Sequence, residues 1–331
     1  WTAEGIFSKS LNDVYYKNLA YEESGKTLSQ TSYMNWDNRP LYTKVADAKS
    51  FTNIYAMYNT SKGYSYSLSL SAAKHFAFGL DLNASYTFTH SESVSSMTSS
   101  VAQSNWRNTH TYRFSNNPEL ANSGYNVPHT VKASAFYHFN WGTNKLFTTT
   151  VGLIYQGQSG SPYSLVYSGD INGDNGTSND LIFIPTDAQV DQMQFLGTDA
   201  YTAEQQRANL KQWLATTRYV KDHRGEYFER YGDNLPFESH FDFHFGQKFG
   251  IRTGKYVHAL ELTLDIMNVA NLLNKDWGRT FSSGYNSEFV SPITYKGDGV
   301  FQFANPSDMP LKYPSSYYSR WRGQVGLKYT F

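Results

Sequence analysis

A strict two-residue alternation that runs to the final residue is the feature that most constrains this chain. Over residues 317–331, one set of alternate positions is mainly apolar and aromatic, while the other set includes three cations. Because successive side chains of a β-strand point to opposite faces, this pattern predicts a strand with one apolar and one charged face. The apolar face of this strand is predicted to carry Tyr317, Trp321, Val325, Leu327, Tyr329 and Phe331.

Seven further segments show the same alternation, so the sequence predicts eight strands. Short and long connections alternate between the strands, which puts all the long connections at one end of an antiparallel sheet. The predicted strands are residues 3–19 (the most polar), 64–72, 78–88, 131–141, 147–156, 237–249, 255–269 and 317–331. The short connections are residues 73–75, 142–145 and 250–254, and the long ones are residues 20–50, 91–129, 157–236 and 270–315.

Aromatic residues make up 17% of the 331-residue chain, with 27 Tyr, 22 Phe and 7 Trp. The mean hydropathy is -0.56, and no segment approaches the roughly 18 consecutive apolar residues of a membrane-spanning helix. A helical membrane protein is therefore excluded. A membrane β-barrel is compatible with both numbers, because alternate residues of its strands face lipid and aromatic residues gather at its two rims.

Strands and connections together predict an all-β fold, a transmembrane antiparallel β-barrel in the outer membrane of a Gram-negative bacterium. Such barrels have short periplasmic turns and long extracellular loops, so we expect the four long connections outside the cell. A soluble ligand-binding β-barrel or sandwich, whose apolar face points inward, is the alternative. The connection of about 80 residues at 157–236 counts against it, since compact soluble domains seldom contain so long a loop.

Charge and cysteine content exclude several classes of function. The chain has 28 Lys and Arg residues against 28 Asp and Glu residues and no basic patch, so nucleic acid is not an expected partner. It has no cysteine, which excludes disulfides and thiolate metal sites. We find no pattern typical of a catalytic triad, a phosphate-binding loop or an acid–base pair, and we therefore predict that the chain is not an enzyme.

Five segments carry a family resemblance: LNDVYYKN at residues 11–18, NTSKGYSY at 59–66, GDINGDNGTSNDLIFIP at 169–185, HRGEYFER at 223–230 and LDIMNVANLLNKDWG at 264–278. Together, and in this order, they resemble the C-terminal barrel of TonB-dependent outer-membrane receptors of the Oar-like branch. The resemblance covers essentially the whole chain. It does not indicate which solute such a receptor would carry.

This resemblance implies a barrel of about 22 strands with a folded plug in its lumen. The eight predicted strands would be its C-terminal part, and the plug, the other strands and the TonB-engaging motif would precede Trp1. The implied function is solute uptake. The implied partners are outer membrane lipid, the barrel assembly machinery, TonB through the upstream region, and an unidentified small-molecule, sugar or peptide ligand. The alternative is a non-transporting barrel that acts as a surface platform or assembly partner.

The segment 170–180 is rich in glycine and in oxygen-bearing side chains. Its first, third and fifth positions match the start of a calcium-binding loop, and Ca²⁺ takes about six to eight oxygen ligands. It departs from an EF-hand because Leu181 replaces the final glutamate. The alternative is a surface turn whose side chains bond their own backbone. The candidate Ca²⁺ ligands are Asp170, Asn172, Asp174, Asn179 and Asp180.

Two further patterns are less specific. Alternate positions of the 237–249 strand carry carboxylates and imidazoles on one face, which can bind a metal or relay protons. The same side chains would also hydrate a polar barrel interior, because lumen-facing positions are polar. Separately, residues 202–214 predict a short helix with Thr202 and Gln205 as a capping box. The lumen-facing polar row comprises Glu238, His240, Asp242 and His244.

Overall fold

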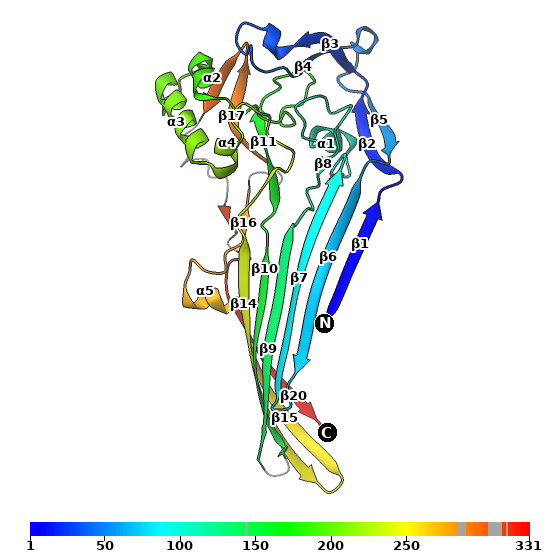
Figure 1. Cartoon of the computed structure of the whole chain (residues 1–331), viewed down its shortest axis with the longest axis vertical. Coiled ribbons are helices and arrows are strands. Elements are labelled where there is room, and N and C mark those ends of the chain that lie inside the picture. The colour runs from blue at the N-terminus through cyan, green and yellow to red at the C-terminus, as the bar shows by residue number, and fades with distance from the viewer. Residues whose placement is uncertain (143–144, 284–288, 304–312, 316) are drawn as a thin grey trace.

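The computed structural model describes residues 1–142, 145–283, 289–303, 313–315 and 317–331, and one long sheet extends below a broad upper region (Figure 1). We call this sheet the wall and the upper region the head. Every neighbouring pair of wall strands is antiparallel. In spatial order the wall consists of β1 (Thr2–Lys9), β6 (Tyr64–His75), β7 (Leu80–Ser93), β9 (His129–Trp141), β10 (Phe147–Gln158), β14 (Glu238–Thr253), β15 (Tyr256–Met267) and β20 (Arg322–Thr330).

The predicted strand count and antiparallel fold are confirmed, and the strand register separates two faces. Directly opposed residues share a face, so the pairing decides which side chains become neighbours. On one face the opposed pairs include Leu70 with Tyr86, Leu153 with Phe243, and Leu262 with Leu327. On the other face they include Ser71 with Ser85, Asn83 with Ser134, and His244 with Asp265.

The wall is an open sheet among the described residues. Its outermost strands, β1 and β20, each pair with a single neighbour, β6 and β15 respectively. A short strand, β8 (Ala121–Asn122), adds to the upper end of β7. Within the same described ranges, no helix is both long and apolar enough to span a membrane.

The first predicted strand, residues 3–19, is wrong in its extent. β1 ends at Lys9, and the chain then bends into β2 (Asp13–Asn18), which pairs with β5 (Tyr55–Thr60) instead of continuing the wall. The carboxylate of Asp13 accepts a hydrogen bond from the N–H of Val14 at 2.9 Å. Such local bonds of Asp and Asn favour a bend over a straight strand, so residues 10–13, which are polar except for Leu11, interrupt the strand.

The final strand is also shorter than residues 317–331. β20 begins at Arg322, whereas residues 317–319 form a turn. Ser319 fixes this turn, because its Oγ accepts from the N–H of Thr280 (3.0 Å) and donates to the Thr280 carbonyl (3.2 Å). Tyr317 and Trp321 therefore lie outside β20, and of the six predicted apolar-face residues only Val325, Leu327 and Tyr329 lie within the strand, with Phe331 just beyond it.

Two of the three predicted short turns are displaced along the chain. β6 continues through His75, so its turn is at 76–79 instead of 73–75; β14 continues through Thr253, so its turn is at 254–255 instead of 250–254. Gly79 has φ +98 and a Cβ there would lie 2.3 Å from the carbonyl oxygen of His138. Only glycine fits so close an approach in this conformation. In the third turn, residues 143–144 lie outside the described residues.

The head is built by the four long connections, which fold into regular elements instead of irregular loops (Figure 1). Its largest sheet has the order β12 (Gln194–Phe195), β18 (Val300–Phe303), β17 (Phe289–Gly297), β11 (Pro162–Ser168) and β13 (Asp233–Asn234), with β11 and β17 parallel. Two small antiparallel sheets of two strands pair β3 (Tyr21–Thr27) with β4 (Pro40–Lys44) and β16 (Phe281–Ser282) with β19 (Tyr313–Pro314). The helices of the head are α1 (Ala102–Arg107), α2 (Asp187–Gln192), α3 (Ala203–Thr216) and α4 (Arg218–Asp222), and its 3-10 turns are η1 (Leu28–Gln30) and η2 (Ala46–Ala48). A fifth helix, α5 (Val269–Leu273), lies below the head beside β14 (Figure 1). Parts of the 270–315 connection, residues 284–288 and 304–312, lie outside the described residues.

The predicted helix at 202–214 is confirmed as α3. The Thr202 side chain accepts from the N–H of Gln205 at 3.2 Å, and the Gln205 side chain accepts from the N–H of Thr202 at 2.8 Å. Its apolar stripe, Leu210, Trp213 and Leu214, is buried in the head. The capping box could be read from the sequence because all its partners lie within four residues of one another.

The hydrophobic core of the chain lies in the head. One cluster draws fully buried residues from three different long connections, and a second cluster holds Trp106. β11 is buried along almost its whole length, as expected for a strand covered on both faces. Representative members of the first cluster are Leu28, Leu165, Ile182, Phe228, Ile293 and Phe301, and the second comprises Tyr42, Trp106 and Phe114.

Candidate metal centre

The segment 170–180 forms a closed loop that follows β11 in the head. The N–H of Tyr167 donates to the carbonyl of Asp180 at 2.8 Å, which brings the two ends of the loop together. At its tip Gly173 has φ +83, and a Cβ there would lie 2.8 Å from the carbonyl oxygen of Tyr42. The loop therefore needs glycine at this position, both for its conformation and for its contact with β4.

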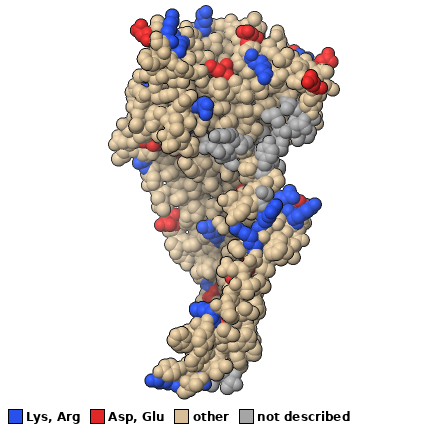
Figure 2. Space-filling model, turned by 180° about the vertical axis from the view of Figure 1, so that it is seen from behind, with Lys and Arg blue, Asp and Glu red and all other residues tan. Residues whose placement is uncertain are grey.

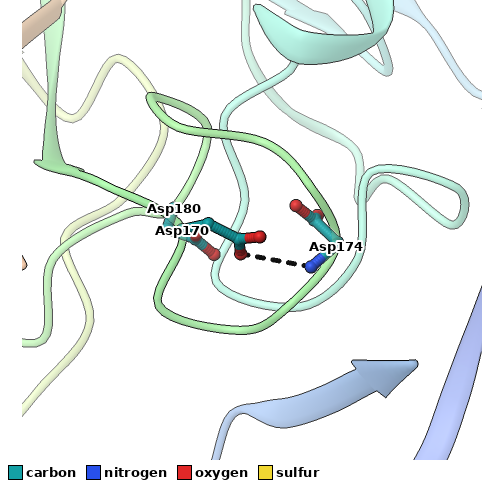
Figure 3. Close-up of side chains that lie close together, drawn as sticks. All are labelled: Asp170, Asp174 and Asp180. Carbon is teal, nitrogen blue, oxygen red and sulfur yellow. Dashed lines mark hydrogen bonds between the residues drawn. The ribbon is translucent and has the colours of Figure 1, made fainter. Parts of the chain in front are cut away.

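Three carboxylates converge inside this loop (Figure 3). One oxygen from each of Asp170, Asp174 and Asp180 lies within 4.8 Å of the other two. Asp174 and Asp180 have no exposed surface, and Asp170 is partly exposed. We call this group the aspartate cluster. Burying charged carboxylates side by side is unfavourable unless a cation or hydrogen bonds compensate them.

Asp170 is compensated by the backbone of its own loop. It accepts hydrogen bonds from the N–H groups of Gly173 (2.7 Å), Asp174 (3.1 Å) and Asn175 (2.8 Å). The amide oxygen of Asn172 accepts a further bond from the N–H of Asp174 at 2.9 Å. These bonds are those of the self-capped turn that the sequence left open as an alternative to a Ca²⁺ loop.

Asp174 and Asp180 are compensated less completely. Asp174 accepts from the N–H of Gly176 (2.8 Å) and from the side-chain amide of Asn179 (2.9 Å). Asn179 is fully buried, yet its Oδ1 has no hydrogen-bond donor, and neither has Oδ1 of Asp180. The structure thus brings all five predicted ligand residues together, and among the described residues it leaves two buried oxygens without a hydrogen-bond donor.

One buried cation, Arg39, lies against the cluster. Its Nη1 is 3.5 Å from Oδ1 of Asp180, while its Nε is 2.9 Å from Oδ2 of Asp37. The guanidinium lies between the rings of Tyr167 and Tyr227, at 5.1 and 5.5 Å from their centroids. Sequence reasoning missed Arg39 and Asp37, because they are separated from the loop by more than 130 positions and show no local motif.

Burial and mutual repulsion disturb the titration of the cluster. Burial, followed by the negative charge of Asp170, raises the pKa of Asp174 to about 7. Burial and then the charge of Asp174 raise the pKa of Asp180 well above its usual value. Burial also raises the pKa of Asp170, although hydrogen bonds from the loop backbone oppose this shift. A cation at the cluster would favour the ionised form of all three carboxylates.

The donor set indicates what the cluster can do chemically. Carboxylate and amide oxygens are the ligands preferred by hard cations such as Ca²⁺ and Mg²⁺. Among the described residues, the aspartate cluster is the one group of His, Cys, Asp or Glu side chains whose ligand atoms lie close enough to share a metal ion. It contains no imidazole or thiolate, so its ligand set suits a hard cation better than a soft transition metal.

The predicted lumen-facing row is dispersed among different partners. His244 Nδ1 lies 2.6 Å from Oδ1 of Asp265 on β15, and Asp242 accepts from the N–H of Asn268 at 2.7 Å. Glu238 and His240 both lie 3.2 Å from the hydroxyl of Thr280. The row follows one face of β14, as predicted, but it is not gathered into a metal site.

A cavity of about 390 Å³ lies where the head meets the upper end of β7. Its lining includes Glu92, His110 and Arg230. Both ring nitrogens of His110 are buried and have no hydrogen-bond partner among the described residues. Burial, followed by the charge of Arg230, lowers the pKa of His110 to about 3. Arg230 donates to the carbonyls of Ser93 and Val94. Sequence reasoning gave His110 no role, because nothing in its local sequence indicates that Arg230 lies beside it.

Comparison with known proteins identifies one family. A family model described as an outer membrane beta barrel domain matches residues 6–289, from within β1 to the first residue of β17. The match therefore includes the wall from β1 to β15 and most of the head. No curated protein and no solved structure matches the chain.

Proposed function

Since the chain belongs to the outer membrane beta barrel domain family and is thus an outer-membrane β-barrel protein, we propose that it works in solute uptake as a TonB-dependent receptor of the Oar-like branch. In this proposal the wall crosses the membrane and the head captures the solute outside the cell. The proposal rests on the resemblance of five sequence segments to that branch, together with the arrangement of wall and head.

The uncovered apolar face of the wall is the observation that carries the membrane role. Leu70 and Leu262 are 58% and 44% exposed, although they lie on long, regular strands. A soluble β-barrel would turn such residues into its core. Here the core lies in the head instead, and the wall keeps its apolar face for lipid.

Orientation is proposed from the two ends of the wall. Its long connections build the head at one end, while short turns close the other end. In Figure 2 charged side chains are spread over the head, Lys and Arg side chains mark the lower tip, and further charged side chains lie between the two ends. In outer-membrane barrels the long connections are extracellular, so we propose that the head projects from the cell and the lower tip faces the periplasm.

The unpaired edges of the wall support a larger barrel. Within the part of the chain that the structure describes, β1 and β20 each have one paired edge and one open edge. An open edge in lipid leaves backbone N–H and C=O groups without partners, at a cost of several kcal/mol for each group. We propose that both edges pair with further strands, as in the barrel of about 22 strands and a plug that the family resemblance implies.

Solute capture is proposed at the cavity between head and wall. Its lining combines two carboxylates, Glu92 and Glu119, with Arg230 and the buried His110. Buried polar groups that lack partners, such as the His110 nitrogens, are what a polar ligand would satisfy. The proposed solute is thus a small polar molecule or a polar end of a larger one, such as a sugar or a peptide.

Surface proteolysis of intact cells that express the full-length protein tests the orientation. We expect cleavage, mapped by mass spectrometry, in the head and not at the 254–255 turn. Cleavage at that turn would reverse the orientation, and no protection of any wall strand would favour a soluble barrel.

Transport needs a separate test. Deletion of the gene and disruption of TonB should impair growth on the same limiting nutrients. A deletion that changes which proteins are displayed at the surface, with normal growth on every nutrient, would favour a surface platform instead.

A further inference from the structure

We propose that the aspartate cluster binds one Ca²⁺ ion, and that this ion stabilises the contacts among three of the connections that build the head, residues 20–50, 91–129 and 157–236. The inference is independent of the transport proposal, because it concerns how the head holds its shape. It rests on four features of the cluster: the spacing of its oxygens, its unpartnered acceptors, its charge, and its contacts with other connections.

Oxygen spacing fits the size of Ca²⁺. Each of the three carboxylate oxygens lies within 4.8 Å of the other two. Ca²⁺ binds oxygen at about 2.3–2.6 Å, so two ligands of one ion lie at most roughly 5.2 Å apart, and the three oxygens are close enough to share one ion. Ca²⁺ takes many protein oxygens as ligands, whereas Mg²⁺ keeps several waters and usually binds one or two carboxylates. A site with three carboxylates and nearby amide oxygens therefore favours Ca²⁺.

Asn179 is an observation separate from the acidic residues. It is fully buried, and its amide nitrogen donates to Oδ2 of Asp174 at 2.9 Å, which holds the side chain against the cluster. Its Oδ1 has no donor within the described residues. Amide oxygens are regular ligands of Ca²⁺, and a cation would give a partner to this atom and a second one to Oδ1 of Asp180, whose contact with Nη1 of Arg39 is long at 3.5 Å.

A cation would also balance the charge of the ionised carboxylates. The group contains four carboxylates, those of Asp37 and the aspartate cluster, against the single guanidinium of Arg39. Its formal charge is thus −4 + 1 = −3 when all the carboxylates are ionised, and a divalent ion reduces it to −1. The self-capped turn explains the bonds of Asp170, but it supplies no charge to balance Asp174 and Asp180, which are buried.

The loop that would hold the ion contacts two other connections. The N–H of Tyr42, on β4, donates to the carbonyl of Asn172 at 2.8 Å. From the 91–129 connection, the N–H of Thr111 donates to the carbonyl of Asn179 at 2.9 Å, and Ser115 Oγ lies 3.1 Å from Asn179 Nδ2. An ion inside the 170–180 loop would therefore stabilise the junction of all three connections.

The test uses the full-length protein in detergent, treated with chelator and then titrated with Ca²⁺. We expect saturable binding of one ion by calorimetry, and terbium luminescence excited through nearby tyrosines such as Tyr42. The head should become resistant to protease as the ion binds. Absence of both binding signals in the folded wild-type protein would overturn the proposal, and equal or tighter binding of Mg²⁺ or a monovalent ion would overturn the choice of Ca²⁺.

Two variants and a control locate the site. Asp174→Asn keeps the shape of the side chain and removes one charge, so we expect at least tenfold weaker Ca²⁺ binding. Asp199→Asn removes an exposed carboxylate elsewhere in the head and should bind as the wild type does. If Asp174→Asn does not fold, Asn179→Asp decides, because an added carboxylate should tighten binding several-fold; unchanged affinity in the folded variant would place the ion elsewhere and overturn the assignment.

Discussion

The wall and the head use apolar residues in opposite ways. The wall keeps rows of Leu, Phe and Tyr exposed on one face, with Leu327 71% exposed, whereas the head buries Leu165, Ile182 and Phe301 completely. The wall therefore needs a surrounding apolar medium to cover its exposed face, whereas the head covers its apolar residues in a hydrophobic core of its own. One chain can thus place apolar residues on the surface in one region, as membrane proteins do, and in a core in another, as soluble proteins do. We therefore expect the two regions to respond to different mutations.

The largest effect should come from removing core packing in the head. Phe301→Ala deletes a fully buried ring that contacts Tyr167 and Tyr295, and it should cost about 3–5 kcal/mol of head stability. We expect the head to become sensitive to protease while the wall keeps its heat-modifiable migration on gels. Phe78→Ala, which truncates a ring that is 62% exposed in a wall turn, is the matched control. Simultaneous loss of both regions would show that they do not differ in the way described.

A charge on the apolar face of the wall should produce the reverse result. Leu262→Arg, or Leu327→Arg on the opposing strand, puts a cation on the proposed lipid face and should cost about 2–4 kcal/mol of insertion free energy. The expected outcome is less folded protein in outer-membrane fractions, measured by heat-modifiable migration. Thr263→Arg, on the polar face of the same strand, should be tolerated. Wild-type migration of both leucine variants would contradict the assignment of this face to lipid.

Acid should weaken the head more than the wall through His110. Burial lowers its pKa from 6.5 to about 3, so the folded state resists protonation. Its contribution to stability is complete above pH 6.5 and is lost as the pH falls from there towards 3. At pH 5 the loss is about 2 kcal/mol.

Comparison of wild type with His110→Phe isolates this effect, because the carboxylates of the aspartate cluster are common to both proteins. Thermal unfolding of the head at pH 7 and pH 5 is the measurement. The wild type should lose more stability than the variant between the two values. An equal loss in both would remove His110 as the cause.

The smallest expected effect is at the start of α3. Thr202→Ala removes the side-chain acceptor of its capping box and should cost about 1 kcal/mol, confined to the head. Hydrogen exchange of the first turn of α3 should rise, with no change in wall strands. Thr202→Ser keeps the hydroxyl and should behave as the wild type. Faster exchange in the wall as well would imply closer coupling of the two regions than their separate cores suggest.

The wall could be predicted from the sequence because its signal is local. Alternation with a period of two residues depends only on neighbours in the chain, and it identified all eight strands. The ends of the strands depend on contacts between residues far apart in sequence and could not be predicted in the same way. The alternation at Tyr317 and Trp321, for example, continues through a turn that hydrogen bonds with Thr280 hold in place. The Asp170 loop could be predicted as a cluster for the same local reason, since its five oxygen-bearing residues lie within eleven positions.

The head could not be predicted as a folded unit. Its contacts join residues far apart in sequence, such as Arg39 with the carbonyl of Leu181 (2.9 Å) and Arg230 with that of Val94 (2.7 Å). In a single sequence these segments show turn residues and short apolar runs, which are as typical of loops as of small packed domains. The four long connections were therefore predicted as loops, although they contain the core of the chain.

The parallel pairing of β11 with β17 has a consequence for the order of assembly. Ser164 lies beside Phe289, so more than 120 residues, including both β14 and β15, separate two neighbouring strands. Loop closure over such a distance is slow, and it becomes easier once the intervening hairpin has brought the two segments to the same end of the sheet. The head should thus close late, after β14 and β15 are in place, and its closure would report that this part of the wall has been completed.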